Sequence, residues 1–353
     1  MKLARLRLRN FRCYKEEIAL ELDDMTAIVG KNDAGKSTVM DALDIFLNDG
    51  TPDKNDATKT GNGKDLTIIC EFTNLPSQVV IDDNVPTAFE AEYLLNARGF
   101  LEIHKSYSGH TATPKCTSIA AYAVHPSADG VGDLMQLKNS ELKKRAKDLN
   151  VDLSGVDQKV NAQLRQRIRD SVGHLNHQPV MVPLNEENAR KAWDGIKSYL
   201  PVFALFKSDR VSTDQDPEAQ DPLKTAVKEA IKQKETELNA IAAHVEAEVR
   251  RIAEKTLEKI KEMDPSLAQQ LNPQIGLKKW DTLFNVSITG ENDIPINKRG
   301  SGVKRLILLN FFRAKAEQEA RERSNAPVIY AIEEPETSQH PHSQRLLVNA
   351  LMD

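Results

Sequence analysis

Apolar and polar positions alternate or cluster along the chain in patterns that predict strands near both ends. Leu6 and Leu8 alternate with arginines in a first strand, and residues 18–22 alternate in a second. A mostly apolar run over residues 25–29 predicts a third strand, which ends at Gly30. Further strands are predicted over residues 66–72, 99–107, 202–206, 284–288 and 328–332.

The middle of the chain shows helical periodicity instead. Helices are predicted over residues 36–47, 134–149, 156–168 and 302–323, and the longest helix over residues 223–263. Within the longest helix, Ile231, Leu238, Val245 and Ile252 recur at seven-residue steps, which predicts a partner helix. Packing within the chain is favoured over a zipper between two chains.

Together these patterns predict an α/β protein in which two strand-rich ends flank a helix-rich middle. We expect an N-terminal lobe at residues 1–130, a helical insertion usable as a dimerisation arm at 131–270, and a C-terminal lobe at 271–353. The sequence has no 18-residue apolar run and no apolar signal core near its start. Neither a membrane span nor a leader peptide is therefore predicted.

Composition and charge narrow the classes of function. The net charge is −4, so a global basic field for nucleic acid is excluded and any DNA contact must come from a local patch. Cys13, Cys70 and Cys116 are widely spaced and fit neither a zinc site nor a disulfide framework. A reducing, cytoplasmic location is the simplest expectation.

The strongest chemical signal is a phosphate-binding loop. Residues 30–37 read G-K-N-D-A-G-K-S and match G-x-x-x-x-G-K-[ST] at every fixed position. The glycines let successive backbone N–H groups face one concavity at a helix start, where phosphate oxygens bind. Lys36 is predicted to bind the outer phosphates and Ser37 to ligate magnesium, so ATP and Mg²⁺ are the expected ligands. The predicted nucleotide-binding residues of this loop are Gly30, Lys31, Asn32, Asp33, Ala34, Gly35, Lys36, Ser37 and Thr38.

A second signal is an apolar strand that ends in carboxylates. Residues 328–336 read V-I-Y-A-I-E-E-P-E. A carboxylate at such a strand end beside a phosphate loop can hold magnesium, and a second one can activate the attacking water. Glu333 is predicted to bind the metal and Glu334 to act as general base. Because the metal-side residue is usually Asp, the division of roles between the two stays open.

A third element precedes the last predicted helix. Residues 298–305 read K-R-G-S-G-V-K-R, and a Gly-Ser-Gly turn at a helix start is a second predicted anion site. An ordinary capped helix start is the alternative. The position favours the anion site, because Gly300 follows Gly30 by 270 residues and precedes Glu333 by 33. The predicted nucleotide contacts here are Arg299, Gly300, Ser301 and Gly302.

In this order the motifs resemble the split ABC ATPases of the SMC, RecF and OLD (overcoming lysogenization defect) families. Residues 30–38 are similar to their G-x-N-x-x-G-K-S-T loop, and residues 299–305 to a divergent signature. Residues 9–14, R-N-F-R-C-Y, are similar to the N-F-R-x-Y/F opening, whose arginine, here Arg12, lies near the nucleotide. Residues 332–341, I-E-E-P-E-T-S-Q-H-P, most closely resemble the OLD pattern I-E-E-P-E-x-x-x-H-P. Residues 48–297 carry no matching motif.

The resemblance implies a split ABC head with a mixed β-sheet that works as a homodimer or higher oligomer. Each ATP would lie between Lys36 of one chain and residues 300–302 of the other. It implies the ATPase module of a DNA-directed nuclease in phage defence, with a further protein or nucleic-acid component. A Toprim nuclease domain is expected only in a longer protein. A RecF- or SMC-like repair ATPase is the first alternative. A transporter subunit or a small-molecule kinase fits less well, because the wide motif spacing argues against the former and the 299–305 element against the latter.

Two basic clusters are the candidate DNA contacts. Arg5, Arg7 and Arg9 share one face of the first predicted strand. The second cluster, in the helical middle, consists of Lys138, Lys143, Lys144, Arg145 and Lys147. Such charges can follow a phosphate backbone, although a solvated helix face also explains the second cluster. The DNA prediction therefore rests mainly on the resemblance.

Overall fold

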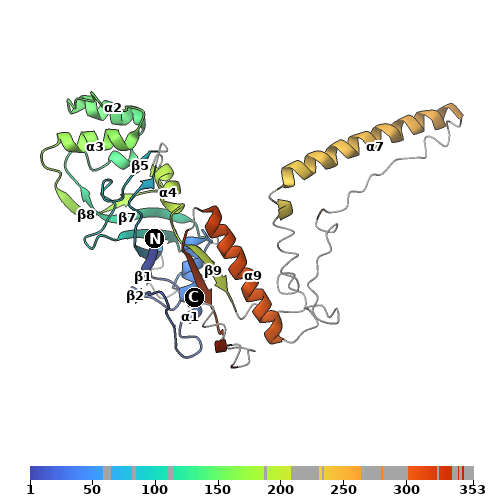
Figure 1. The fold of residues 1–353 in the computed structure, drawn as a ribbon, viewed down its shortest axis with the longest axis horizontal. Coiled ribbons are helices and arrows are strands. Elements are labelled where there is room, and N and C mark those ends of the chain that lie inside the picture. Colours follow the sequence, from blue (N-terminus) through green and yellow to red (C-terminus); the bar gives the residue numbers. More distant parts are fainter. Residues whose placement is uncertain are drawn as a thin grey trace. The chain divides into compact units, whose positions relative to one another are not determined.

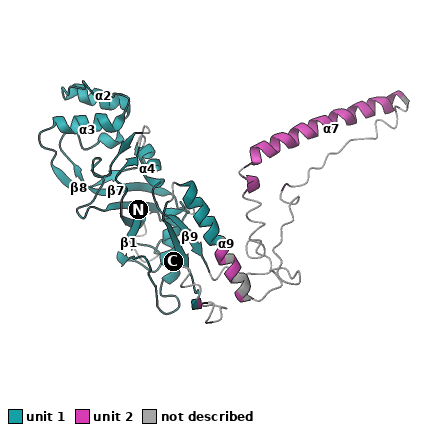
Figure 2. Ribbon diagram, viewed as in Figure 1, with its two compact units in different colours: residues 1–207, 312–335, 345–353 teal, residues 208–311, 336–344 magenta. Residues whose placement is uncertain are grey.

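The computed structural model divides the chain into two compact units (Figure 2). The first unit comprises residues 1–207, 312–335 and 345–353, and the second comprises residues 208–311 and 336–344. The structure describes residues 1–58, 65–81, 85–109, 111, 114–186, 189–207, 230–232, 234–263, 265, 280, 301–323, 326–335, 341 and 344–345. The predicted strand at 284–288 and residues 223–229 of the longest predicted helix lie outside these ranges.

A six-stranded sheet is the largest sheet described in the first unit (Figure 1). Its order is β2-β1-β3-β6-β7-β8, and every neighbouring pair is antiparallel. Side chains alternate between its faces, so Leu6 and Leu8 are fully buried on one face while Arg5, Arg7 and Arg9 lie on the opposite face. The strands are β1 (Lys2–Arg9), β2 (Ile18–Glu21), β3 (Asp65–Thr73), β6 (Leu101–Ser108), β7 (Cys116–Pro126) and β8 (His177–Pro183). A separate short pair consists of β4 (Val79–Val80) and β5 (Pro86–Thr87).

A second, two-stranded sheet lies between two helices. Strands β9 (Val202–Phe206) and β10 (Val328–Ile332) are parallel and in register. Alternation sends one face toward the main core, where Phe203 and Ala331 pack with α1 (Lys36–Leu47). The other face, with Val202, packs against Ala316 and Ala320 of α9 (Ser301–Glu322). These elements form an α/β/α arrangement of layers.

Helix α1 is the central element of the core. Its Val39, Leu43 and Phe46 are 5% exposed or less and pack with the strands of the large sheet. Because the same helix also packs against β9, its apolar surface is broader than one amphipathic stripe. The predicted helix over residues 36–47 is confirmed with these bounds.

The remaining described elements extend these layers. A short 3₁₀ helix, η1 (Leu134–Gln136), precedes α2 (Asn139–Asp148), which pairs with α3 (Asn161–Ser171) around a small apolar core. Helix α4 (Ala189–Lys197) adds Trp193 and Ile196 to the main core. Helix α7 (Glu235–Met263) belongs to the second unit, and its Ile241, Val245, Val249 and Ile252 are exposed. Among the described helices, none combines the length and apolarity of a membrane span.

One predicted strand is wrong. Residues 25–29 form no strand, and Met25 and Val29 are 59% and 88% exposed. The physical reason is a turn after β2, in which the backbone N–H of Asp23 donates to Thr26 Oγ1 at 3.0 Å. The turn directs this run away from the sheet, so its apolar residues have no strand partner within the described part of the chain.

A buried lysine fixes the C-terminal end of α1. Lys105 of β6 donates to the Phe46 carbonyl at 2.7 Å and to Asp49 at 2.8 Å. Its side chain is 2% exposed, and its ammonium lies 4.9 Å from the Phe46 ring centroid and 5.0 Å from that of Trp193. A cation at a helix C-terminus satisfies free carbonyls and the helix dipole together. Lys105 therefore joins α1 to the large sheet.

We expect Lys105→Met to lower the free energy of unfolding by about 2–3 kcal/mol, because the Phe46 carbonyl loses its charged donor and Asp49 is left with Lys197 as its paired cation. The measurement is the urea midpoint of the full chain. Lys115→Met is the matched control, since Lys115 is exposed just before the neighbouring strand. Equal midpoints for both variants would contradict the anchoring role of Lys105.

Candidate nucleotide-binding site

The predicted phosphate loop leads directly into α1. Helix α1 begins at Lys36, so Gly35 is its N-cap residue and Ser37 is exposed in its first turn. The Lys36 ammonium donates to the carbonyl oxygens of Gly30 and Lys31, both at 2.8 Å. An ammonium has three donors, so two of them hold the lysine across the loop and one can reach a phosphate. The loop is thus organised around its lysine at the positive end of the helix.

Gly35 adopts a conformation that other residues avoid. Its φ is +90°, and an added Cβ would lie 2.6 Å from both Cys13 Sγ and Tyr14 Oη. The Tyr14 hydroxyl donates to the Gly35 carbonyl at 3.2 Å, so the turn after β1 packs against the loop. Gly30 differs, because a Cβ there would make an ordinary 3.5 Å contact with Ala34. The two glycines of the motif are therefore under different constraints.

Arg12, predicted to lie near the nucleotide, is held by carboxylates. Its Nε donates to Asp56 at 2.7 Å, and its Nη1 pairs with Asp41 of α1. Burial would lower the pKa of this guanidinium, but the hydrogen bonds to Asp56 and Asp41 raise it above its ordinary value. Arg12 therefore joins the turn after β1 to α1. Lys207 also pairs with Asp41, and sequence reasoning had assigned no role to either residue of that pair.

The packing of α1 on β9 decides where the loop and the acidic strand end lie. Asn48, just after α1, donates to the Phe203 carbonyl of β9 at 3.1 Å, whereas Asp41 pairs with Lys207 just after β9. Earlier residues of α1 therefore match later residues of β9, and the two elements run in opposite directions. Extending this match brings the start of α1, with the phosphate loop, to the carboxyl end of β9.

The two predicted catalytic glutamates follow β10 at that same end. Strand β10 is parallel to β9, with Ile332 opposite Phe206, and the Glu333 N–H donates to the Phe206 carbonyl at 2.9 Å. Lys36 and the Glu333–Glu334 pair therefore lie toward one end of these layers in the first unit, although they are about 300 residues apart in sequence. Figure 1 shows α1, β9 and the end of β10 together.

The two glutamates differ in burial and backbone. Glu333 is 9% exposed at the strand end, whereas Glu334 is exposed and has a φ of +44°. A left-handed residue other than glycine is strained, here directly before Pro335, and such strain is concentrated at functional sites. The metal role of Glu333 and the general-base role of Glu334 stay predictions.

The donors present fit a magnesium–nucleotide site. Among the described residues, no group of three or more His, Cys, Asp or Glu side chains gathers in a form that could hold an ion. Magnesium on a nucleotide needs few protein ligands, because phosphate oxygens and water fill most of its octahedron. The Ser37 hydroxyl and the Glu333 carboxylate are hard oxygen donors of the required type.

The predicted signature falls partly outside the described residues. Arg299 and Gly300 are not described, and Ser301 is the first residue of α9, followed by Gly302. Both belong to the second unit, whereas Lys36 and Glu333 belong to the first. These four residues stay predictions as nucleotide contacts.

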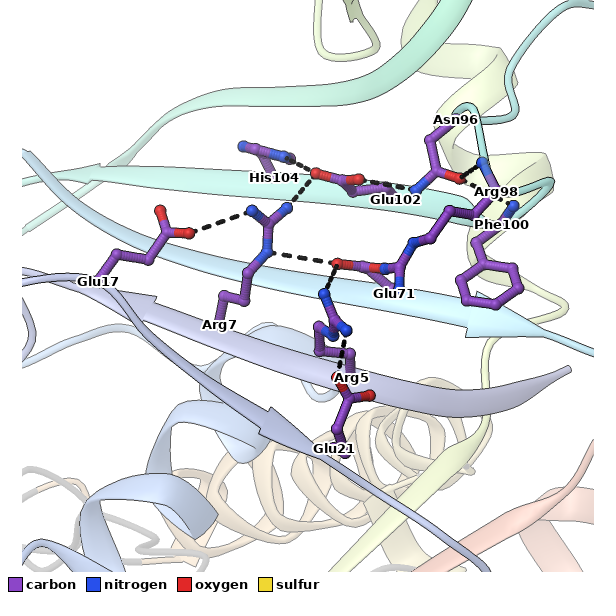
Figure 3. Close-up of polar contacts among 10 residues, drawn as sticks. All are labelled: Arg5, Arg7, Glu17, Glu21, Glu71, Asn96, Arg98, Phe100, Glu102 and His104. Atoms are coloured by element: carbon purple, nitrogen blue, oxygen red, sulfur yellow. Dashed lines mark hydrogen bonds and ion pairs between the residues drawn. The ribbon is translucent and has the colours of Figure 1, made fainter.

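Two of the three predicted DNA-facing arginines, Arg5 and Arg7, have carboxylate partners on their own sheet face (Figure 3), whereas Arg9 donates to Thr67 Oγ1 at 3.4 Å. Arg7 pairs with Glu102 and lies 3.4 Å from Glu71, and Arg5 pairs with Glu21. Glu71 and Glu102 are almost fully buried, with side chains 2% and 6% exposed. Such carboxylates need a paired cation, so Arg5 and Arg7 stabilise the sheet whatever else they contact.

In the second basic cluster, Arg145 differs from the lysines in its contacts. Arg145 of α2 makes a two-pronged contact with Asp133, at 2.7 and 2.8 Å, and also donates to the Gly130 carbonyl. This arginine therefore fixes the start of the helical pair. Lys143, Lys144 and Lys147 lie on the same helix and are less buried than Leu142 and Ala146.

The arrangement of loop, lysine and strand-end carboxylates defines a P-loop nucleotide-binding protein. The AAA ATPase domain family matches residues 1–353, and the chain belongs to that family. Over 50 residues the chain is 52% identical to an OLD nuclease of Thermus scotoductus. That match covers 14% of this chain and 9% of the relative. Family membership supports ATPase activity and implies nucleotide binding, usually with Mg²⁺.

We expect Gly35→Ala to weaken ATP binding about tenfold or more and Gly30→Ala to weaken it much less. A left-handed conformation costs a residue with a Cβ roughly 1–2 kcal/mol, and Tyr14 must also move. Titration with a fluorescent ATP analogue measures both variants, with circular dichroism as the folding control. Equal affinities for the two variants would show that the loop conformation differs from the one described.

The buried Glu102 of the large sheet gives a second prediction, which concerns the pH dependence of stability. Burial would raise the pKa of Glu102, but hydrogen bonds with His104 and Asn96 and the charge of Arg7 hold it below its ordinary value. A depressed carboxylate pKa adds stability above the unfolded value, roughly 4.3, and loses it as pH falls through the folded pKa.

Wild-type stability should therefore fall more steeply from pH 5 to pH 3 than that of Glu102→Gln. Urea midpoints across this range give the two slopes, and Glu90→Gln, at an exposed site, is the control. Equal slopes for wild type and Glu102→Gln would contradict the lowered pKa of Glu102.

Proposed function

We propose that this chain is an ATP-hydrolysing head of the split ABC type, within an OLD-like, DNA-directed nuclease of phage defence. The observation that supports it best is the common end shared by the phosphate loop and the Glu333–Glu334 pair, which follows from the opposite directions of α1 and β9. The three-domain division, the coiled-coil-like insertion and the cytoplasmic location are parts of the same proposal.

In this proposal each residue of the site has one task. Backbone N–H groups of the loop and the Lys36 ammonium bind the β- and γ-phosphates, and Ser37 and Glu333 would hold the magnesium ion. That ion, when bound, neutralises charge on the phosphates. Glu334 accepts a proton from the water that attacks the γ-phosphorus, and the bond to the β–γ bridging oxygen breaks, which gives ADP and phosphate. The exposure of Glu334 suits a group that must reach water.

The dimer part of the proposal concerns residues 299–302. In a head-to-tail pair they would contact the γ-phosphate that Lys36 of the other chain holds. ATP would then favour the closed pair, and hydrolysis would release it, because these contacts require the γ-phosphate. A nucleic acid as the polymer acted upon is supported by the short match to a relative that is named an OLD nuclease, and DNA in particular follows from the resemblance of the motifs.

We expect Lys36→Ala to lose ATP binding and turnover together, because the loop loses the cation that closes it. Glu334→Gln should keep ATP affinity and lose turnover about 10²- to 10⁴-fold, since only the general base is removed. Phosphate release and nucleotide titration separate the two. Lys54→Ala and Glu90→Gln, both at exposed positions outside the site, are the controls.

The same variant tests the sandwich. With ATP, Glu334→Gln should accumulate as a dimer in light scattering, and wild type should do so only transiently. A Glu334→Gln chain that stays monomeric with saturating ATP would remove the sandwich from the proposal. Equal turnover in wild type, Lys36→Ala and Glu334→Gln would remove the assigned catalytic roles.

A further inference from the structure

Asp41, in the second turn of α1, joins three segments that are distant in sequence. One carboxylate oxygen, Oδ2, pairs with Arg12 Nη1, 29 positions away, and the other, Oδ1, pairs with Lys207 Nζ, 166 positions away. The Asp41 side chain is 13% exposed. Aspartate is a weak helix former in a helix interior, so its presence here calls for a tertiary reason. The two cations supply that reason.

Each cation belongs to a segment that contacts one half of the candidate site. Arg12 lies in the turn whose Tyr14 hydroxyl donates to Gly35 of the phosphate loop. Lys207 directly follows Phe206, whose carbonyl accepts the backbone N–H of Glu333. Asp41 itself is one helical turn beyond Ser37. A single carboxylate therefore connects the loop, its helix and the strand end that carries the acidic pair.

Because both carboxylate oxygens of Asp41 have a partner, the orientation of this carboxylate is restricted. A carboxylate with one partner can rotate about its own axis, whereas one with partners on both oxygens cannot turn without breaking a contact. The position of Lys207, and through it the end of β9, is thus set relative to α1. Asp44, one turn later on the same helix, differs because its carboxylate contacts the nearby Asn48 side chain at 2.8 Å on an exposed surface.

We propose that Asp41 is a positioning residue of the ATPase site, which sets the Glu333–Glu334 strand end against the phosphate loop through Arg12 and Lys207. The proposal rests on the function proposed above. Asp41 touches neither the phosphates nor the attacking water in this scheme. Its loss should misplace the general base while the loop still binds nucleotide, so kcat falls and ATP affinity changes little. A displacement of about 1 Å in such a site can cost up to about 100-fold in rate.

The test compares Asp41→Asn, Lys207→Met, the double variant and the control Asp44→Asn in the full chain. Phosphate release gives kcat and KM, a fluorescent ATP analogue gives Kd, and urea midpoints report stability. We expect each single variant to lower kcat about 10-fold or more, with Kd within about twofold of wild type. The kcat of the double variant should be no lower than that of the worse single variant, because both substitutions break the same Asp41–Lys207 contact.

Asp41→Glu, which keeps the charge, should recover part of the lost kcat. Lys207→Met keeps the Arg12–Asp41 pair and so guards against a variant that simply fails to fold. A kcat for Asp41→Asn equal to that of Asp44→Asn overturns the proposal, as do multiplicative losses in the double variant. An increase in Kd as large as the fall in kcat also overturns it. Absence of ATP binding and turnover in wild type identifies failure of the proposed function itself, and the positioning role falls with it.

Discussion

The structure depends on the burial of one helix between two sheets. Helix α1 packs on the large antiparallel sheet through Val39, Leu43 and Phe46, and on β9 at the other side. Burial of the apolar side chains of α1 on both sides supplies the main stabilisation, because each Å² of apolar surface removed from water contributes roughly 25 cal/mol. Polar contacts then fix direction, because Lys105 holds the C-terminal end of α1 and Asn48 reaches β9. With α1 so fixed, the phosphate loop can open only toward the carboxyl end of β9.

Two kinds of charged side chain can be distinguished in this fold: those that stabilise it through ion pairs and those that can take part in binding or catalysis. Arg7 and Arg12 are each paired with carboxylates that are themselves mostly buried. Arg5 pairs with the exposed Glu21 and lies 3.9 Å from the buried Glu71. Lys36 contacts backbone carbonyls and Glu334 is exposed at a strained position, so both can respond to a ligand. An arginine-rich strand is therefore no sign of nucleic-acid binding by itself, since the opposing strands supply the matching acids. The ATPase assignment does not depend on those arginines.

Much of the fold was predictable wherever a local pattern agreed with the tertiary environment. Strands β9 and β10 are continuous apolar runs, and their predicted bounds are confirmed. The glycine loop and α1 were predictable because the motif fixes backbone chemistry. Strand β8 was missed because Pro179, Pro183 and several exposed residues conceal its alternation. The apolar run at 25–29 misled for the opposite reason, because a turn removes it from the sheet.

The candidate site shows the same division. Lys36, Ser37, Glu333 and Glu334 could be predicted because their types and order carry the chemistry. Asp41 and Lys207 could not, because their contact spans 166 positions and follows only from how α1 lies on β9. Arg12 was predicted from a resemblance, and its two carboxylate partners were not. Residues that position a site depend on packing, which one sequence does not display.

In the proposed site, residues some 300 apart in sequence fold around one magnesium–triphosphate. The most direct measurement is an experimental structure of the chain with Mg²⁺ and a non-hydrolysable ATP analogue. The predicted result is a triphosphate bound by the loop and by Lys36, with the carboxylates of Glu333 and Glu334 facing its γ-phosphate. A nucleotide bound elsewhere, or an acidic pair on the far side of the molecule from Lys36, would contradict it.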